Sequence, residues 1–88
     1  MKIKYKKAFL KNYQKRIKSN KNLVKKFNER LLTFADNPSD SQLRNHRLTG
    51  GMNDYFSFSI TGDIRVVYRI IDNIVYFYDV GSHNQVYK

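Results

Sequence analysis

The chain has 88 residues, with 17 Lys and Arg against 7 Asp and Glu, and a formal net charge of +10. A chain of this length is expected to form one domain over residues 1–88. The lack of cysteine excludes disulfides and thiolate metal sites. The apolar runs are far shorter than a membrane span, and the first residues do not resemble a signal peptide. We therefore expect a soluble cytoplasmic protein that does not interact with membranes.

The positive charge is concentrated in the first third of the chain. Residues 1–30 hold twelve Lys and Arg and one acidic residue, Glu29, whereas residues 31–88 hold five Lys and Arg and six Asp and Glu. A basic region of this density attracts polyanions such as RNA, DNA, an anionic membrane or an acidic protein segment. The alternative is a solvated, lysine-rich face with no partner.

A strand and two helices are predicted in the first half of the chain. Lys2–Tyr5 alternates polar and apolar residues, which is typical of a short strand. Apolar residues recur at helical spacing over about residues 7–19 and again over about residues 23–35. Pro38 ends the second helix, because proline disfavours helical geometry in the residue before it. The two segments are close enough in sequence to form a helical hairpin.

Three strands are predicted in the second half, after a loop over residues 38–54 that shows little periodicity. The strands cover residues 56–60, 64–71 and 74–80. The turns between them are short, and such turns require antiparallel neighbours. The predicted fold class is α+β: an N-terminal strand, a basic two-helix hairpin, then an antiparallel sheet of three to four strands with the helices on one face.

Alternation along the strands divides the side chains between the two faces of the sheet. Val66 and Tyr68 are predicted to face the helices, and Arg65 and Val67 to face the other way with Ser57. Ser59 and Arg69 share that second face. We therefore expect a concave polar site there, and no second core.

The segment after the last predicted strand is polar and contains a histidine. Gly-Ser-His-Asn-Gln-Val-Tyr, residues 81–87, follows the apolar run 74–80. A small domain has no structural need for such a tail, so His83 and Tyr87 indicate a site at the end of a strand. The other histidine, His46, lies in the predicted loop.

Three motifs in order resemble the RelE/ParE toxin superfamily, especially its YafQ-like branch. Residues 43–51, Leu-Arg-Asn-His-Arg-Leu-Thr-Gly-Gly, resemble its L-x-x-H-x-L-x-G loop. Residues 62–69, Gly-Asp-Ile-Arg-Val-Val-Tyr-Arg, resemble its D-x-R-v-v-Y strand, and residues 81–87 resemble its closing G-x-H-x-x-v-Y/F motif. The resemblance covers nearly the whole chain and implies a RelE-like fold.

The resemblance also implies the toxin of a type II toxin–antitoxin pair. Relatives of this branch enter the ribosomal A site and cut mRNA there by attack of a ribose 2′-OH on the adjacent phosphate, without a metal or other cofactor. The implied partners are the ribosome with its rRNA and mRNA, and a cognate acidic antitoxin that forms a hetero-oligomer with the toxin and folds on binding. The scattered carboxylates and two histidines show no spacing typical of metal ligands.

Five residues match the functional positions of that branch. His46 is a candidate general base, and Asp63 is a carboxylate that orients a histidine or acts as the base. Arg65 is a candidate clamp for the phosphate, because guanidinium offers a planar, permanently charged fork. His83 is the first choice for the general acid, since imidazole titrates near neutrality. Tyr87 stacks on an mRNA base or takes part in proton transfer.

RNA contacts and two departures complete this interpretation. Lys11, Lys15 and Lys18 are predicted to meet ribosomal RNA, and Arg47 and Arg69 to form a basic rim around the site. The YafQ-like branch has a histidine where this chain has Ser59, and an aromatic residue where it has Ile64. Arg65 would compensate for the missing histidine charge.

Other interpretations of the same residues remain open at this stage. His46 and Asp63 could simply serve the loop and the turn. Arg65 could pair with Asp79 across the sheet, and Tyr87 could pack as an edge aromatic. At the level of function, the alternatives are a non-catalytic ParE-like toxin that binds DNA gyrase, and an inactive relative that only binds antitoxin.

Overall fold

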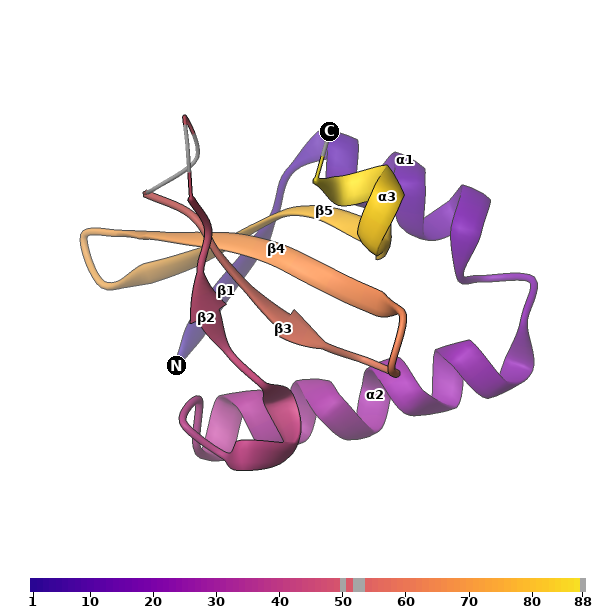
Figure 1. The fold of residues 1–88 in the computed structure, drawn as a ribbon, viewed down its shortest axis with the longest axis horizontal. Helices are drawn as coiled ribbons and strands as arrows, with labels where there is room; N and C mark the ends of the chain where they lie inside the picture. Colours follow the sequence, from indigo (N-terminus) through magenta and orange to yellow (C-terminus); the bar gives the residue numbers. More distant parts are fainter. Residues whose placement is uncertain (50, 52–53, 88) are drawn as a thin grey trace.

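The computed structural model describes residues 1–49, 51 and 54–87 (Figure 1). Gly50, part of the predicted loop motif, lies outside the described residues. The elements in chain order are β1 (Lys2–Tyr5), α1 (Lys7–Arg16), α2 (Lys21–Asp36), a 3-10 turn η1 (Ser41–Leu43), β2 (His46–Arg47), β3 (Phe56–Ser59), β4 (Ile64–Ile71), β5 (Ile74–Ser82) and α3 (His83–Val86). The predicted α+β class is confirmed.

The strands form one sheet in the order β1-β5-β4-β3-β2 (Figure 1). The β2, β3, β4 and β5 neighbours are antiparallel, and β1 pairs with β5 in parallel. The antiparallel part thus has four strands, within the three to four expected, and the N-terminal strand β1 brings the sheet to five. Strand β2 could not be predicted from the sequence, because it has only two residues, both exposed, and shows no alternation.

The two long helices differ from their predicted bounds for reasons of capping. Helix α1 ends at Arg16 and not near residue 19, because the N–H groups of Ile17 and Lys18 both donate to the Tyr13 carbonyl. Helix α2 begins at Lys21, since the Asn20 side chain accepts from the Leu23 N–H and so caps the helix. Within the described part of the chain, no helix is long and apolar enough to cross a membrane.

Helices α1 and α2 cover one face of the sheet and form the main core with it. Phe9 of α1, Ile17 directly after it, and Phe27 and Phe34 of α2 are buried there. Phe34 is central, because its ring stacks on Phe58 with centroids 4.6 Å apart and meets Tyr68 edge-on at 5.0 Å. Phe34 also meets Phe77 edge-on at 5.9 Å, so its ring packs against β3, β4 and β5 at once.

The opposite face, which we call the open face, has a small apolar cluster of its own. Leu48, Val67 and Val86 are buried together on it, with Tyr55 and Tyr87 packed at the edge of the cluster. The expectation that this face has no second core was therefore wrong. The reason is α3, which formed where a tail without structure was expected and brings Val86 over the sheet.

We predict that Phe34→Ala lowers the free energy of unfolding by about 3–5 kcal/mol, because it leaves a cavity at the centre of the core. Urea unfolding followed by far-UV circular dichroism measures this change. Leu32→Ala is the matched control: Leu32 lies on the same helix but is 73% exposed, so its loss should cost little. Equal effects of the two substitutions would contradict this account of the core.

Candidate active site on the open face of the sheet

The site is built around the guanidinium of Arg65, on β4. Its Nε donates to Ser57 Oγ at 2.9 Å, and its Nη1 donates to Ser59 Oγ at 2.6 Å. Its Nη2 donates to the carbonyls of Arg44 at 2.9 Å and Ser57 at 3.2 Å. Both serines lie on β3, and Ser59 faces Arg65 across the ladder, so strand register places these partners. Only 7% of Arg65 is exposed.

All of these acceptors are neutral. Buried charges in proteins are normally paired with an opposite charge. Among the described residues, the only ion pairs join Arg16 to Asp79 and Arg69 to Asp54. Arg65 is therefore a nearly buried cation compensated only by hydroxyl and carbonyl dipoles, and the open face around it is a favourable place for an anion.

His46 lies beside this guanidinium at the edge of the sheet. Its Nδ1 is 3.1 Å from the Arg44 carbonyl and 3.3 Å from Arg65 Nη2. The two Nη2 hydrogens are accounted for by two carbonyls at shorter distances, so we assign the Nδ1 hydrogen to a bond donated to Arg44. That tautomer leaves Nε2 as a free proton acceptor on an exposed ring.

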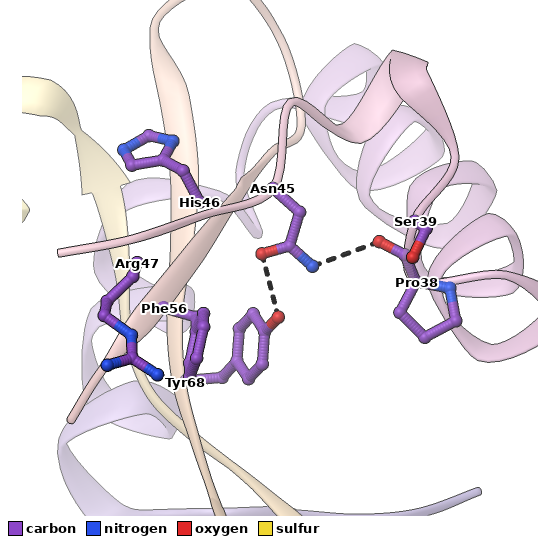
Figure 2. Close-up of a pocket in the computed structure, with 7 residues that line it drawn as sticks. All are labelled: Pro38, Ser39, Asn45, His46, Arg47, Phe56 and Tyr68. Carbon is purple, nitrogen blue, oxygen red and sulfur yellow. Dashed lines mark hydrogen bonds between the residues drawn. The ribbon is translucent and has the colours of Figure 1, made fainter.

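A network on the other side of β2 anchors the strand that carries His46. Asn45 accepts from the Tyr68 hydroxyl at 2.8 Å and donates to the Pro38 carbonyl at 3.1 Å. Figure 2 shows Asn45 and Arg47 pointing to one side of the strand and His46 to the other. Burial raises the pKa of Tyr68, and the Asn45 hydrogen bond acts in the opposite direction. The network lines a hollow of about 400 Å³. Its polar groups bond mainly to one another, so we assign the network a role in positioning β2 and His46.

Helix α3 positions His83 and Tyr87. Ser82 and Gln85 form a capping box, in which Ser82 Oγ accepts from the Gln85 N–H and Gln85 Oε1 accepts from the Ser82 N–H. The Tyr87 hydroxyl bonds to Ser57 Oγ, the group that also accepts from Arg65. The rings of His83 and Tyr87 meet edge-on with centroids 4.3 Å apart. Tyr87 is therefore not merely an edge aromatic.

The other end of α3 is held against α1 through Gly81. A Cβ at this glycine would lie 2.6 Å from Gln85 Oε1 and 2.7 Å from Arg16 Nη1. Arg16 also donates to the Val80 carbonyl at 3.0 Å and lies 3.4 Å from Asp79 Oδ1. The alternative pairing of Arg65 with Asp79 is thus wrong, because Asp79 is bound by α1.

Asp63 is the one candidate catalytic residue that is not joined to this group. It is exposed in the turn between β3 and β4, and none of the hydrogen bonds among the described residues uses its carboxylate. The turn is closed by Thr61, whose Oγ1 accepts from the N–H groups of Asp63 and Ile64. Ile64 pairs with Ser82, so Asp63 lies near the start of α3 in the register of the sheet.

The predicted RNA-contacting residues divide into two groups. Lys11 and Lys15 are exposed on α1, and Lys18 is exposed just beyond its end. Arg47 and Arg69 were predicted as a simple rim, but both stack on aromatic rings. The Arg47 guanidinium is 5.3 Å from the Phe56 centroid, and that of Arg69 is 5.6 Å from the Tyr55 centroid.

Sequence reasoning missed three partners of the site. Ser57 and Ser59 were placed on the correct face but not recognised as the groups that hold Arg65. Arg44 was missed entirely, although its carbonyl contacts both Arg65 and His46; it has a left-handed φ of 45°, which nothing in its residue type indicates. The helix that holds His83 did carry a signal, the Ser-x-x-Gln of the capping box.

The assembled group can bind a phosphodiester and transfer protons beside it. The Arg65 charge suits the anion, Nε2 of His46 can accept a proton, and the His83 ring and Tyr87 hydroxyl can donate one. In the described part of the chain, no three His, Cys, Asp or Glu side chains gather where they could hold a metal ion.

Solved toxin structures have the same fold over nearly the whole chain. A copper-bound mutant toxin from Helicobacter pylori is 27% identical, with 98% of each chain covered and a TM-score of 0.75. The match to the DinJ-YafQ toxin–antitoxin complex of E. coli is 25% identical, covers 98% of this chain and 96% of the other, and has a TM-score of 0.70. For the YoeB-YefM complex of Staphylococcus aureus the values are 25%, 94%, 97% and 0.75. The fold is therefore that of toxins of the RelE-like class.

The particular family follows from the sequence. The family model described as a bacterial toxin of the type II toxin–antitoxin system, YafQ, matches residues 1–88. The chain belongs to this family, which confirms the predicted resemblance. A search of curated proteins gave no match.

We predict that Gly81→Ala displaces Gln85 and Arg16, opens the capping box and loosens α3. Crowding of this kind costs about 1–3 kcal/mol of stability, measurable by urea unfolding. The ring signals of His83 in an NMR spectrum should shift at the same time. Gly62→Ala is the matched control, since a Cβ there would meet nothing within 4 Å. An unchanged His83 environment in Gly81→Ala would contradict the role given to α3.

Proposed function

We propose that this toxin is an endoribonuclease that cuts mRNA in the ribosomal A site and so inhibits translation. The observation that carries the proposal is the nearly buried guanidinium of Arg65, which pairs with no carboxylate of the described residues and lies beside His46 and, through Ser57, beside Tyr87. An RNA phosphate is the anion that such a site suits, and proton donors and acceptors stand around it. Membership in the YafQ family supports the same conclusion.

The proposed reaction uses the protein's own side chains in three roles. His46 Nε2 takes the proton of the ribose 2′-OH, whose oxygen then attacks the adjacent phosphorus. The positive charge of Arg65 stabilises the negative charge that develops on the phosphate oxygens. The bond from phosphorus to the 5′-oxygen breaks, and His83 protonates that leaving group. The products are a 2′,3′-cyclic phosphate and a 5′-hydroxyl, with no step that requires a metal.

The contacts of Arg65 refine its role. Four of its hydrogen bonds go to protein oxygens, so few N–H groups remain for a phosphate. We therefore assign it long-range stabilisation of charge and the placement of Ser57, with a forked phosphate clamp as the lesser part. The Tyr87 hydroxyl, held by Ser57, is the second candidate donor to the leaving group. Asp63 would join the site only through movement of its exposed turn.

The high positive charge of the toxin favours two negatively charged partners, ribosomal RNA and an acidic antitoxin. With a net charge of +10, the toxin would bind ribosomal RNA through Lys11, Lys15 and Lys18 on the side of α1. The cognate antitoxin would be acidic and would wrap the toxin in a hetero-oligomer. The solved DinJ-YafQ toxin–antitoxin complex and YoeB-YefM complex, whose toxin chains are similar to this one, support a complex with an antitoxin.

We expect purified protein to cut ribosome-bound mRNA at the A-site codon and to leave 2′,3′-cyclic phosphate ends. Treating the toxin with EDTA and removing the chelator before the assay should not change the result. His46→Gln and His83→Gln should each lower the single-turnover rate by about 10²–10⁴-fold, the usual range for a general acid or base. Both side chains are exposed, so thermal unfolding of the variants should match that of the wild type. Intact mRNA with the wild type would refute the nuclease and favour gyrase binding or simple antitoxin binding.

Docking is tested separately from cleavage. Changing Lys11, Lys15 and Lys18 together to Gln should weaken ribosome binding and reduce the salt dependence, with a slope of log K against log salt lower by about 2–3. The matched control changes Lys21, Lys25 and Lys26 of α2, which removes the same charge from the other helix. Equal losses in the two triple variants would mean that net charge matters and the α1 surface does not.

A further inference from the structure

Three tyrosines lie on the open face beyond the site, and the chemistry proposed above does not use them. Tyr78 and Tyr55 meet edge-on with centroids 5.0 Å apart. The ammonium of Lys6 lies 5.4 Å from the Tyr76 ring and 5.6 Å from the Tyr78 ring. We call Tyr55, Tyr76 and Tyr78 the tyrosine strip. All three are half-buried, so each ring is packed on one side and still meets solvent.

Positive charges accompany the strip on both sides. In the sheet register, Lys2 lies beside Ile74 and Lys4 beside Tyr76, which places these lysines and then Lys6 on the open face. Arg69 faces Tyr76 from β4 and stacks on Tyr55. Arg69 pairs with Asp54 at 3.9 Å, but the Asp54 side chain is 74% exposed, and an ion pair this solvated is weak.

The strip continues directly from the site. The apolar cluster of Leu48, Val67 and Val86 has Tyr87 at one border and Tyr55 at another. Arg69 is four residues along β4 from Arg65, about 13 Å at the usual rise of a strand. A chain that passes the site could therefore run on over the cluster to Tyr78 and Tyr76 without leaving the face.

Stability alone does not account for this composition. Helices α1 and α2 pack on the other face, and α3 covers only the end of the open face nearest the site (Figure 1). The solvated face of an antiparallel sheet normally carries polar side chains. Alternating aromatic rings and cations instead match the way proteins hold single-stranded nucleic acid, with bases on the rings and phosphates on the cations.

We propose that the tyrosine strip, with Lys2, Lys4, Lys6 and Arg69, binds the single-stranded RNA that flanks the cleaved nucleotide. The inference deepens the proposed function by adding a second contact region to the same RNA. Because stacking uses the π face that every base has, binding by the strip is tolerant of sequence. The strip therefore contributes affinity and the path of the strand, while any codon preference has to arise at the site itself.

The test measures equilibrium binding of fluorescent single-stranded RNA that is fully 2′-O-methylated and so cannot be cut by a 2′-OH. The wild type should bind a nonanucleotide at least about five-fold more tightly than a trinucleotide, as expected for one additional stacked base. Replacing Tyr76 and Tyr78 together by Leu should abolish this length advantage. Replacing both by Phe keeps the rings and should preserve it.

Charge and folding are controlled in the same assay. Lys6→Gln should weaken binding of the nonanucleotide more than Lys26→Gln, which removes one exposed charge from α2. Far-UV circular dichroism and thermal unfolding should show that the Leu variants remain folded, because the two rings lie at the surface of the sheet.

Three outcomes would overturn the inference: equal affinity for the short and long RNA, wild-type binding by the Leu variant, or loss of binding with Phe as well as with Leu. A Leu variant that keeps its RNA affinity but loses antitoxin binding would assign the strip to a protein partner. These results are independent of cleavage. If the wild type fails to cut ribosome-bound mRNA but shows the length advantage, the proposed nuclease activity is refuted and RNA binding by the tyrosine strip is supported.

Discussion

The rest of the site depends on one constraint, the desolvation of a guanidinium that no carboxylate of the described residues neutralises. Leaving such a group unbonded would cost several kcal/mol, so its donors have to be satisfied by whatever oxygens the strands provide. Ser57 and Ser59 supply hydroxyls from β3, and Arg44 supplies a carbonyl from the segment before β2. The same oxygens then fix the position of His46 and of Tyr87. Meeting the needs of Arg65 therefore assembles the neighbouring groups as a consequence.

This constraint also explains how His46 and His83, which are far apart in the sequence, belong to one site. His46 belongs to the edge strand β2, and His83 begins the helix after β5, with β3 and β4 between them in the sheet. A route through side chains crosses that gap, from His46 to Arg65, Ser57, Tyr87 and finally His83. The strands carry rigid hydrogen-bonded backbones, so a group built in this way moves little on its own. The exposed turn of Asp63 lacks such support.

The limits of prediction follow the same physics. Long elements could be predicted, because Ile64–Ile71 is rich in β-branched residues and α2 repeats its apolar residues at helical spacing. The face of Arg65 followed from parity alone, yet its partners did not, since serine is equally common on solvated strands. The alternative that paired Asp79 with Arg65 stayed open, because sequence spacing cannot show that Arg16 reaches the end of β5. Arg44 and the two-residue β2 depend on tertiary contacts, and no local signal encodes them.

The positive charges on the helices and the charge of Arg65 on the open face differ in their desolvation free energy. The lysines of α1 and α2 are solvated and cost little to keep, whereas Arg65 is already desolvated. A polyanion that reached only the helices would gain mainly counter-ion release, which salt weakens. An anion that reached Arg65 would meet a charge that water screens poorly, so its interaction would persist at higher salt. Under the proposed function, RNA and an acidic antitoxin segment would compete for that same charge. An antitoxin that covers only the helices would block docking through Lys11, Lys15 and Lys18 but leave Arg65 accessible, whereas an antitoxin that reaches the open face would block the chemistry directly.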